Sequence, residues 1–372
     1  MIESQSQCER RVRWVIPNPN PRSASLRYRC LYPMEELKKA GRSIGFWKEG
    51  ESIDAGLTLV FEAWSVFPTV NPLSTAEALV IFAEQAVLKG ARVVVDNCDN
   101  QFACSTEIDG WSSGLEFLRR LAGIAQVMVC CSNALGEEMR RQFGENLKIQ
   151  VIDDGLESSL LLESDSFWKR VLSPTRKLAW LWALHLLIWL GFNRVGKRTP
   201  LVWFGSHGNP FANGGMLDLK GKAEVLIELN SRYPISLTII SNNRKKFDSN
   251  FQGWPFPIHY IEWNRVTFHS ILRWHQIALI PSVDNEFTRC KSSNRLTLAA
   301  FHGLAVVADP MPAYLPYNSV IANGDWLTNL ERLIICPGER EKLVAKARDF
   351  VCQRNAKELI ASQWDGVFFS KK

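Results

Sequence analysis

The sequence lacks acidic residues throughout one long window, from Ser166 to Leu217. The whole chain of 372 residues carries 44 Lys and Arg against 38 Asp and Glu, and its net charge of +6 arises in this window. The remainder is close to neutral. A basic excess confined to one segment, without a recognisable nucleic-acid module, does not indicate a nucleic-acid-binding protein. The cations of the window are Lys169, Arg170, Arg176, Lys177, Arg194, Lys197 and Arg198.

Several other patterns are missing. The nine cysteines form no CxxC pair and have no histidine at ligand spacing, so we expect reduced, mostly structural thiols and no metal site. No GxGxxG fingerprint for a dinucleotide is present. Residues 1–13 contain no apolar stretch of the kind found in signal peptides, which predicts a cytoplasmic protein. With 46% hydrophobic and 22% charged residues, the chain is typical of a globular protein.

Short apolar runs alternate with helical patterns along the chain. Strands are predicted near 12–16, 57–61, 92–95, 127–131 and 149–152, and a second series follows near 201–204, 236–240, 277–280 and 304–308. Ser74 and Ser132 are expected to begin helices, and Gly90 to end one. Such alternation predicts parallel sheets in two doubly wound, Rossmann-like α/β domains, with ligands bound in the cleft that the domains face.

The predicted organisation has four parts. Residues 1–165 form an acceptor-side domain, and residues 166–197 form a basic and apolar insertion. Residues 198–340 form a donor domain, and residues 341–372 form a helical segment that packs back on the first domain.

The insertion contains an apolar helix from Leu178 to Phe192, interrupted only by His185. Its fifteen residues span about 22 Å, which is less than the roughly 30 Å hydrocarbon core of a bilayer. Its tryptophans and basic flanks favour an interfacial helix on an anionic membrane, and we assign membrane contact to residues 170–198. The alternative is a helix buried between the domains.

Two segments are typical of anion binding. Lys291, Asn294 and Arg295 lie at a predicted helix start, where free N–H groups and the helix dipole favour a diphosphate. Gly205, Ser206 and His207 follow a strand and allow a ligand to approach the backbone closely. An ordinary capped helix and a simple turn are the alternatives.

Two further segments lie at predicted strand ends of the first domain. Asp96 and Asp99 are candidates for a general base or for holding a sugar, with an Asx turn as the alternative. Arg27 and Arg29 follow the first strand and are candidates for contacting phosphate or acceptor, with a charged loop as the alternative.

Together these segments resemble GT-B glycosyltransferases of the family-four and family-one type. The resemblance is carried, in the expected order, by SLRYRCLYPMEELKKAG, VVVDNCDN, VMVCCSNALGEEMRRQFG, VIDDGLE, LVWFGSHGN and IALIPSVDNEFTRCKSSNRLTLAAFHGLAVVAD. It implies the two-domain GT-B architecture and donor binding through a Lys-x-x-Asn-Arg variant of the donor motif. Retaining members of family four usually carry two glutamates eight residues apart. Here those positions are Cys290 and Leu298, or Glu286 and Asn294 in a shifted register, so the stereochemistry stays open.

The resemblance implies a transferase that moves a sugar from a nucleotide diphosphate sugar to a hydroxyl, in surface polysaccharide or glycolipid biosynthesis. Lys291, Asn294, Arg295, Gly205, Ser206 and His207 would bind the donor, Asp99 or Asp96 would be catalytic, and Arg27 and Arg29 would face the acceptor. We expect no cofactor and no required metal. The partners are then the donor, a glycan or lipid-linked acceptor, and a membrane surface, with the protein peripheral on its inner face. A nucleotide-sugar epimerase of the same architecture and a non-catalytic glycan-binding relative are the alternatives.

Overall fold

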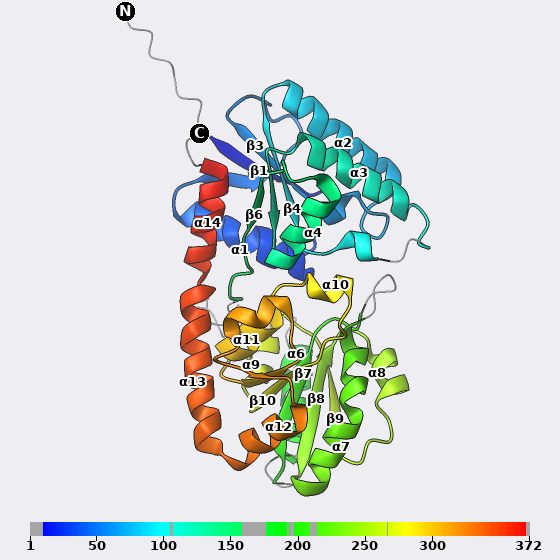
Figure 1. The fold of residues 1–372 in the computed structure, drawn as a ribbon, viewed down its shortest axis with the longest axis vertical. Helices are drawn as coiled ribbons and strands as arrows, with labels where there is room; N and C mark the ends of the chain where they lie inside the picture. The colour runs from blue at the N-terminus through cyan, green and yellow to red at the C-terminus, as the bar shows by residue number, and fades with distance from the viewer. Residues whose placement is uncertain are drawn as a thin grey trace, which may run out of the picture. The chain divides into compact units, whose positions relative to one another are not determined.

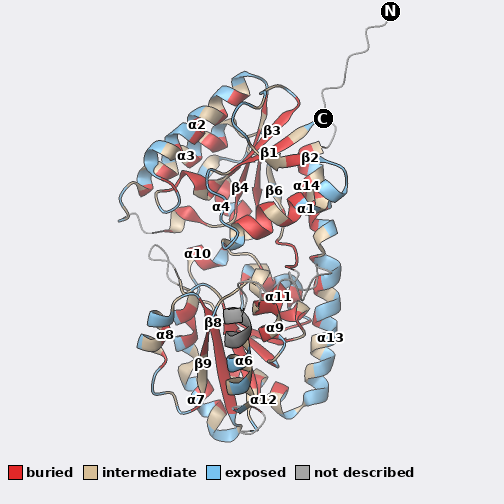
Figure 2. Ribbon diagram, turned by 180° about the vertical axis from the view of Figure 1, so that it is seen from behind, coloured by how far each residue is buried: buried red, intermediate tan, exposed pale blue. Residues whose placement is uncertain are grey.

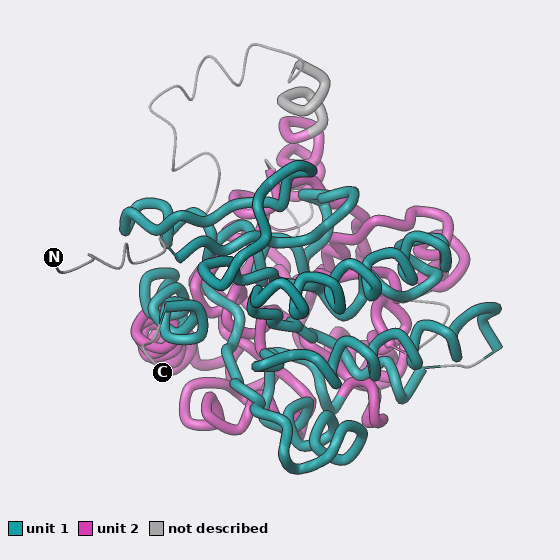
Figure 3. Tube along the Cα trace, turned by 90° about the horizontal axis from the view of Figure 1, so that it is seen from above, with its two compact units in different colours: residues 1–155, 289–292, 355–372 teal, residues 156–288, 293–354 magenta. Residues whose placement is uncertain are grey.

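A computed structural model describes residues 10–104, 107–157, 176–191, 193, 197–208, 214–265 and 267–369. The chain divides into two compact units (Figure 3). Unit 1 comprises residues 1–155, 289–292 and 355–372, and unit 2 comprises residues 156–288 and 293–354. Each unit contains one six-stranded parallel sheet. The fold class expected from the alternating strands and helices is therefore confirmed.

Unit 1 has the strand order β2-β1-β3-β4-β5-β6. Helices cover both faces of this sheet, with α2 and α3 on one face and α1 and α14 on the other (Figure 1). The bounds are β1 Arg11–Val15, η1 Leu26–Leu31, α1 Tyr32–Lys39, β2 Ser43–Phe46, β3 Leu57–Glu62, η2 Ala63–Val66, α2 Leu73–Leu88, β4 Arg92–Asn97, η3 Gln101–Ala103, α3 Trp111–Ile124, β5 Val127–Cys130, α4 Asn133–Phe143, β6 Ile149–Val151 and α14 Lys357–Phe369.

Unit 2 has the strand order β12-β11-β10-β7-β8-β9. Its central strands are buried on both faces (Figure 2), as expected when helices cover a parallel sheet on both sides. The bounds are α6 Arg176–Leu190, β7 Thr199–Phe204, η5 Gly215–Lys222, α7 Ala223–Arg232, β8 Ile235–Ser241, α8 Arg244–Asn250, β9 Ile258–Glu262, α9 Phe268–Leu272, β10 Ile277–Ile280, α10 Glu286–Arg289, α11 Asn294–Phe301, β11 Ala305–Ala308, η6 Pro312–Tyr317, β12 Ala322–Asn323, α12 Trp326–Ile335 and α13 Pro337–Arg354.

The alternation of side chains along β7 divides the core of unit 2 into two layers. Val202 and Phe204 pack with residues of α9, α11 and α13, whereas Leu201 and Trp203 pack with residues of α7, α8 and α12. A strand whose side chains are apolar on both faces can bury all of them only between two helical layers. This requirement explains why the apolar runs in the sequence are continuous.

Local end signals were partly correct. The Ser132 hydroxyl accepts a hydrogen bond from the Leu135 N–H at 3.2 Å and begins α4 as predicted. Gly90 follows α2 with a φ of +87°, a conformation that glycine adopts without strain. The prediction for Ser74 is wrong, because α2 begins at Leu73 after Pro72. The fixed φ and missing N–H of proline suit a helix start equally well.

The C-terminal residues are shared between the units. α13 belongs to unit 2, where Ala347 and Val351 enter the core. α14 belongs to unit 1, where the Trp364 and Phe368 rings lie 6.1 and 5.4 Å from the Trp14 ring of β1. The N-terminal part of the chain that belongs to unit 1 ends at Gly155. The sequence placed this boundary later, at residue 165.

The predicted apolar helix appears as α6, which belongs to unit 2. The Trp182 and Trp189 rings lie 5.4 and 6.0 Å from the Trp274 ring, so one side of α6 packs on its own unit. Leu184 and Leu187 are 40% and 66% exposed. Residues 170–175, 192 and 194–196 of the predicted membrane segment lie outside the described residues. In the described part of the chain, no helix combines the length and hydropathy that crossing a bilayer requires.

All six histidines lie in unit 2, and five of them are hydrogen-bonded in its interior or against its strands. His185 Nδ1 is 2.8 Å from His259 Nε2, and His269 Nδ1 is 2.8 Å from His302 Nε2. His275 is 5% exposed and bonds to the Thr238 hydroxyl at 2.7 Å. Burial lowers the pKa of His275 and of His259 to about 4, and that of His302 to about 3.

Acidification from pH 7 to pH 5 is expected to remove about 2 kcal/mol of stability from unit 2 through His275 alone. The unfolded residue takes up a proton below about pH 6.5, but the buried residue stays neutral down to about pH 4. Its contribution is therefore complete above pH 6.5 and is lost as the pH falls toward 4. Urea unfolding of the wild type and of His275→Gln at both pH values measures it. The stability advantage of the wild type should shrink at pH 5, and an unchanged advantage would contradict the assignment.

Candidate functional site

Because all strands of unit 1 are parallel, the polar residues that follow them gather at one edge of its sheet. Asp96 is the residue before the last of β4 and is in register with Glu62, the last residue of β3. Arg29 enters from η1, and Asp154 follows β6. These four side chains come from three strand ends and one helix that are far apart in the sequence.

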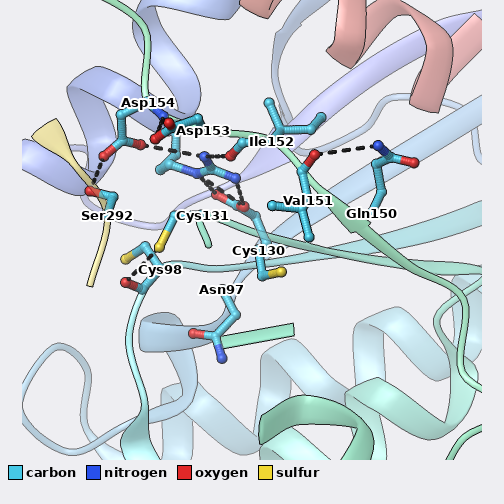
Figure 4. Close-up of polar contacts among 12 residues, drawn as sticks. Asn97, Cys98, Cys130, Cys131, Gln150, Val151, Ile152, Asp153, Asp154 and Ser292 are labelled. Atoms are coloured by element: carbon cyan, nitrogen blue, oxygen red, sulfur yellow. Dashed lines mark hydrogen bonds and ion pairs between the residues drawn. The ribbon is translucent and has the colours of Figure 1, made fainter. Parts of the chain in front are cut away.

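Arg29 forms the centre of this cluster and is 1% exposed. Its Nη2 donates to Asp96 Oδ1 at 2.7 Å, and its Nε lies 3.2 Å from each Asp96 oxygen. Nη1 donates to the Ile152 carbonyl and lies 3.4 Å from Asp154 Oδ1 (Figure 4). Burial opposes the charge of Arg29, but Asp96 more than offsets it and raises the pKa of Arg29. The contacts of Arg29 and Asp96 are those of a buried structural ion pair.

Glu62 lies beside this pair without a hydrogen bond to its buried Oε1. Burial, reinforced by the Asp96 charge, raises the pKa of Glu62 to about 8. Near neutral pH, Glu62 is therefore mostly protonated and neutral. This lowers the negative charge that surrounds Arg29. Arg27 is 4% exposed and has a different task, since its Nη1 donates to the carbonyls of Pro21 and Arg22 and holds the proline-rich loop.

Asp99 lies in the loop after β4 and is more accessible, with a side chain 15% exposed. Trp64, in the η2 turn that follows β3, donates its indole N–H to Asp99 Oδ2 at 2.8 Å. The Lys291 ammonium is hydrogen-bonded to Asp99 Oδ1, and the side chain of Lys291 is 42% exposed. Burial opposes the charge of Lys291, but Asp99 more than offsets it and raises the pKa of Lys291.

Lys291 lies in a short segment, residues 289–292, that belongs to unit 1 together with Asp99. The Ser132 hydroxyl donates to the Cys290 carbonyl at 2.8 Å. The Ser292 hydroxyl donates to Asp154 Oδ2 at 2.6 Å (Figure 4). Three polar contacts therefore fix residues 290–292 of this segment, and they join residues 158, 138 and 192 positions apart in the chain.

In unit 2 the predicted donor residues lie at the carboxyl edge of its sheet. Gly205 follows β7, and a Cβ added there would lie 3.5 Å from Cδ of Arg295, so the side chain of Arg295 lies against Gly205. Asn294 and Arg295 form the first turn of α11, whose N-cap residue Ser293 makes no side-chain cap bond. The structure thus brings Gly205 and Arg295 together.

Ser206 and His207 precede Gly208, whose backbone lies against that of Gly215. A Cβ on Gly215 would lie 2.5 Å from the backbone nitrogen of Gly208, so the two backbones touch at a distance that only glycine permits. The His207 carbonyl accepts a hydrogen bond from Lys246 at 2.7 Å. Burial and the Lys246 charge lower the pKa of His207. Residues 209–213 lie outside the described part of the chain.

Three residues of these sites were missed from the sequence. Trp64 and Asp154 each follow a strand, and the position after a parallel strand is a signal that could have found them. Asp218 accepts a hydrogen bond from the Gly215 N–H at 3.1 Å and senses the charge of Arg295. No local pattern marks Asp218. Within the described ranges, no group of three His, Cys, Asp or Glu residues is arranged to hold a metal ion.

Solved structures with the same architecture exist. HepE of Anabaena in complex with UDP and glucose matches over 97% of this chain and all of its own, with 13% identity and a TM-score of 0.64. The chain has the GT-B fold. Sucrose-phosphate synthase of Thermosynechococcus elongatus matches over 96% and 98%, with 12% identity and a TM-score of 0.62. The UDP-forming trehalose-phosphate synthase of Burkholderia vietnamiensis matches over 91% and 75%, with 10% identity and a TM-score of 0.54.

No protein-family model matches the sequence, and no curated protein matches it either. At identities of 10–13%, the likeness concerns the fold. The architecture implied by the order of motifs is thus confirmed. The roles of individual residues rest on their contacts within each unit.

Proposed function

We propose that this protein is a glycosyltransferase that moves a sugar from a nucleotide diphosphate sugar to a hydroxyl group. The observation that carries the proposal is the packing of Arg295 on Gly205 at the carboxyl edge of the unit 2 sheet, in a chain with the GT-B fold. Parallel α/β sheets bind ligands at this edge. HepE, which shares the fold, is in complex with UDP and glucose.

The proposed reaction needs three functions. A cation must stabilise the diphosphate as the bond from the anomeric carbon to its oxygen breaks, and Arg295 and Lys291 would supply it. Gly205, Ser206, His207 and the first turn of α11 at Asn294 would line the donor site. A base must take the proton of the attacking hydroxyl, and Asp99 would do so with greater access than Asp96, which Arg29 engages on both oxygens. The nucleotide sugar is a substrate, and the proposal includes no resident cofactor or metal.

Replacing Arg295 by Ala is expected to weaken binding of a nucleoside diphosphate about 10- to 100-fold. A charged hydrogen bond to a diphosphate contributes about 1.5–3 kcal/mol, and the small side chain cannot replace it. Calorimetric titration with UDP, GDP and ADP measures the loss of affinity. It also identifies the nucleobase that the protein recognises. The matched control is Lys342→Ala, which removes an exposed cation from α13.

Equal affinity of the wild type and Arg295→Ala would overturn the donor site. Product analysis then separates the enzyme classes. Sugar transfer requires an acceptor, whereas an epimerase converts the nucleotide sugar in its absence. A non-catalytic relative would bind the nucleotide but would neither transfer nor epimerise the sugar.

We further propose that the acceptor is a glycan or lipid-linked glycan in surface polysaccharide or glycolipid synthesis, and that the protein is peripheral on the cytoplasmic membrane face. The acid-free window supports attraction to anionic lipid. The exposed Leu184 and Leu187 of α6 lie about one helical turn apart, on the side away from Trp274. They offer apolar area for shallow insertion.

The double variant Leu184→Gln with Leu187→Gln is expected to bind anionic vesicles at least about tenfold more weakly. Burying a leucine side chain contributes about 1.5–3 kcal/mol, and glutamine loses most of it. Flotation with vesicles containing an anionic phospholipid measures the bound fraction. Leu88→Gln is the control, because Leu88 is an 87% exposed leucine of α2. Equal flotation of wild type and double variant would exclude α6 as the contact.

A further inference from the structure

The two oxygens of the Asp99 carboxylate have different kinds of partner. Oδ2 accepts the indole N–H of Trp64, whose ring packs on Phe67 and Trp111 with centroids 5.5 and 5.9 Å apart. Oδ1 accepts the ammonium of Lys291, a long side chain that is 42% exposed. The first partner is fixed by aromatic packing, and the second reaches the carboxylate from a partly solvated position.

The Lys291–Asp99 pair involves two residues that the proposed reaction needs for different substrates. Lys291 would serve the diphosphate, and Asp99 would serve the acceptor hydroxyl. While they are paired, the positive charge of Lys291 is directed to the carboxylate, and Oδ1 of Asp99 is occupied. The Lys291 side chain is 42% exposed, and a partly solvated ion pair is weak enough for a diphosphate to displace the carboxylate.

We propose that Lys291 changes partner during the reaction, from Asp99 in the nucleotide-free protein to the diphosphate of the bound donor, and thereby frees Asp99 Oδ1 for the acceptor. This inference rests on the proposed function. Trp64 stays on Oδ2 and keeps the carboxylate in place. Oδ1 of Asp99 takes the proton of the acceptor hydroxyl. At the same time, the oxygen of that hydroxyl forms a bond to the anomeric carbon of the donor sugar. The electron pair of the broken bond leaves with the diphosphate, which Lys291 and Arg295 neutralise.

The exchange couples the two substrates. Donor binding makes the base available, so the acceptor binds better once the donor is present, and by thermodynamic linkage the acceptor strengthens donor binding equally. The exchange also predicts that one substitution increases the affinity for nucleotide. Removing the charge of Asp99 releases Lys291 from its competitor, so the affinity for nucleotide should increase although the proposed base is lost.

Calorimetric titration with UDP, GDP and ADP tests this sign. Asp99→Asn keeps an oxygen that accepts the Trp64 N–H, and it is expected to bind the recognised nucleotide about two- to fivefold more tightly than wild type. Lys291→Ala should bind it more weakly. In the Lys291→Ala background, adding Asp99→Asn should give no gain, because the lysine that would be released is absent. Asp109→Asn, which removes an exposed acid of unit 1, should leave affinity within about 1.5-fold if only Asp99 competes for Lys291.

The outcomes are distinct. Tighter binding in Asp99→Asn that disappears in the double variant supports the exchange. Unchanged or weaker binding in Asp99→Asn, with a wild type that binds nucleotide, overturns the exchange and leaves the proposed function intact. An equal gain in Asp109→Asn also overturns it, because the effect is then a general one of net charge. A folded wild type that binds none of the three nucleotides overturns the proposed function and this inference together.

Discussion

Replacing Asp99 by Asn is expected to lower the rate of sugar transfer about 10²–10⁴-fold, which is the usual contribution of a general base. The amide has nearly the same shape as the carboxylate and can still accept the Trp64 N–H, but it cannot take a proton from the acceptor. The loss should therefore appear in kcat, because donor binding is not weakened by this substitution. Release of nucleoside diphosphate from the donor, with and without acceptor, measures it.

Two comparisons make this result specific. Asp109→Asn removes an exposed acid from the same unit and should retain turnover within about twofold. Circular dichroism of Asp99→Asn should match that of the wild type, because the carboxylate is partly exposed and lies in a loop. Turnover within tenfold of wild type would show that another group accepts the proton.

Replacing Arg29 by Met is expected to lower the free energy of unfolding of unit 1 by about 3–5 kcal/mol. Methionine fills much of the space but carries no charge. Asp96, which is 3% exposed, would then be buried without its counter-ion, and the Ile152 carbonyl would lose its donor. The Trp364 ring, 5.2 Å from the guanidinium carbon, would lose its cation as well. Urea unfolding followed by tryptophan fluorescence measures the change.

Two further variants show whether the loss arises from the burial of the ion pair and from the charge left on Asp96. Arg42 forms a bidentate ion pair with Asp365 on the surface, and Arg42→Ala should cost no more than about 1 kcal/mol. Adding Asp96→Asn to Arg29→Met should recover part of the loss, since the carboxylate that Arg29 contacts most closely is then neutral. A loss below 1 kcal/mol in Arg29→Met would mean that the acids of this cluster are protonated or hydrated in the native state.

The limits of sequence reasoning are clearest at Arg29 and Asp96. Both were candidates for contacting substrates, because each follows a strand and is charged. Their side chains instead pair with each other across 67 positions of the chain. Asp99, only three residues from Asp96, faces a different partner. Neighbouring acids in one loop cannot be distinguished by spacing when their partners come from other strands.

Some omissions had a signal in the sequence. The buried residues Trp111, Gly114, Leu118, Leu121 and Ala122 of α3 repeat at helical spacing and would have predicted this helix. Others had none. The segment of residues 289–292 belongs to unit 1 because of its contacts with Asp99, Ser132 and Asp154. The contiguous segment that resembles a donor motif is therefore divided between two units, which a pattern along the chain cannot reveal.

The sequence by itself determined the alternation of buried strands and helices, the helix start at Ser132, the stop at Gly90 and the GT-B architecture. These features depend on side-chain periodicity and backbone preferences within a few residues, which a linear chain records directly. Only the tertiary structure decided which charges are buried structural partners, that Lys291 pairs with Asp99, and which side of α6 packs on unit 2. Those features depend on pairing between residues up to 192 positions apart, and folding alone brings such residues together.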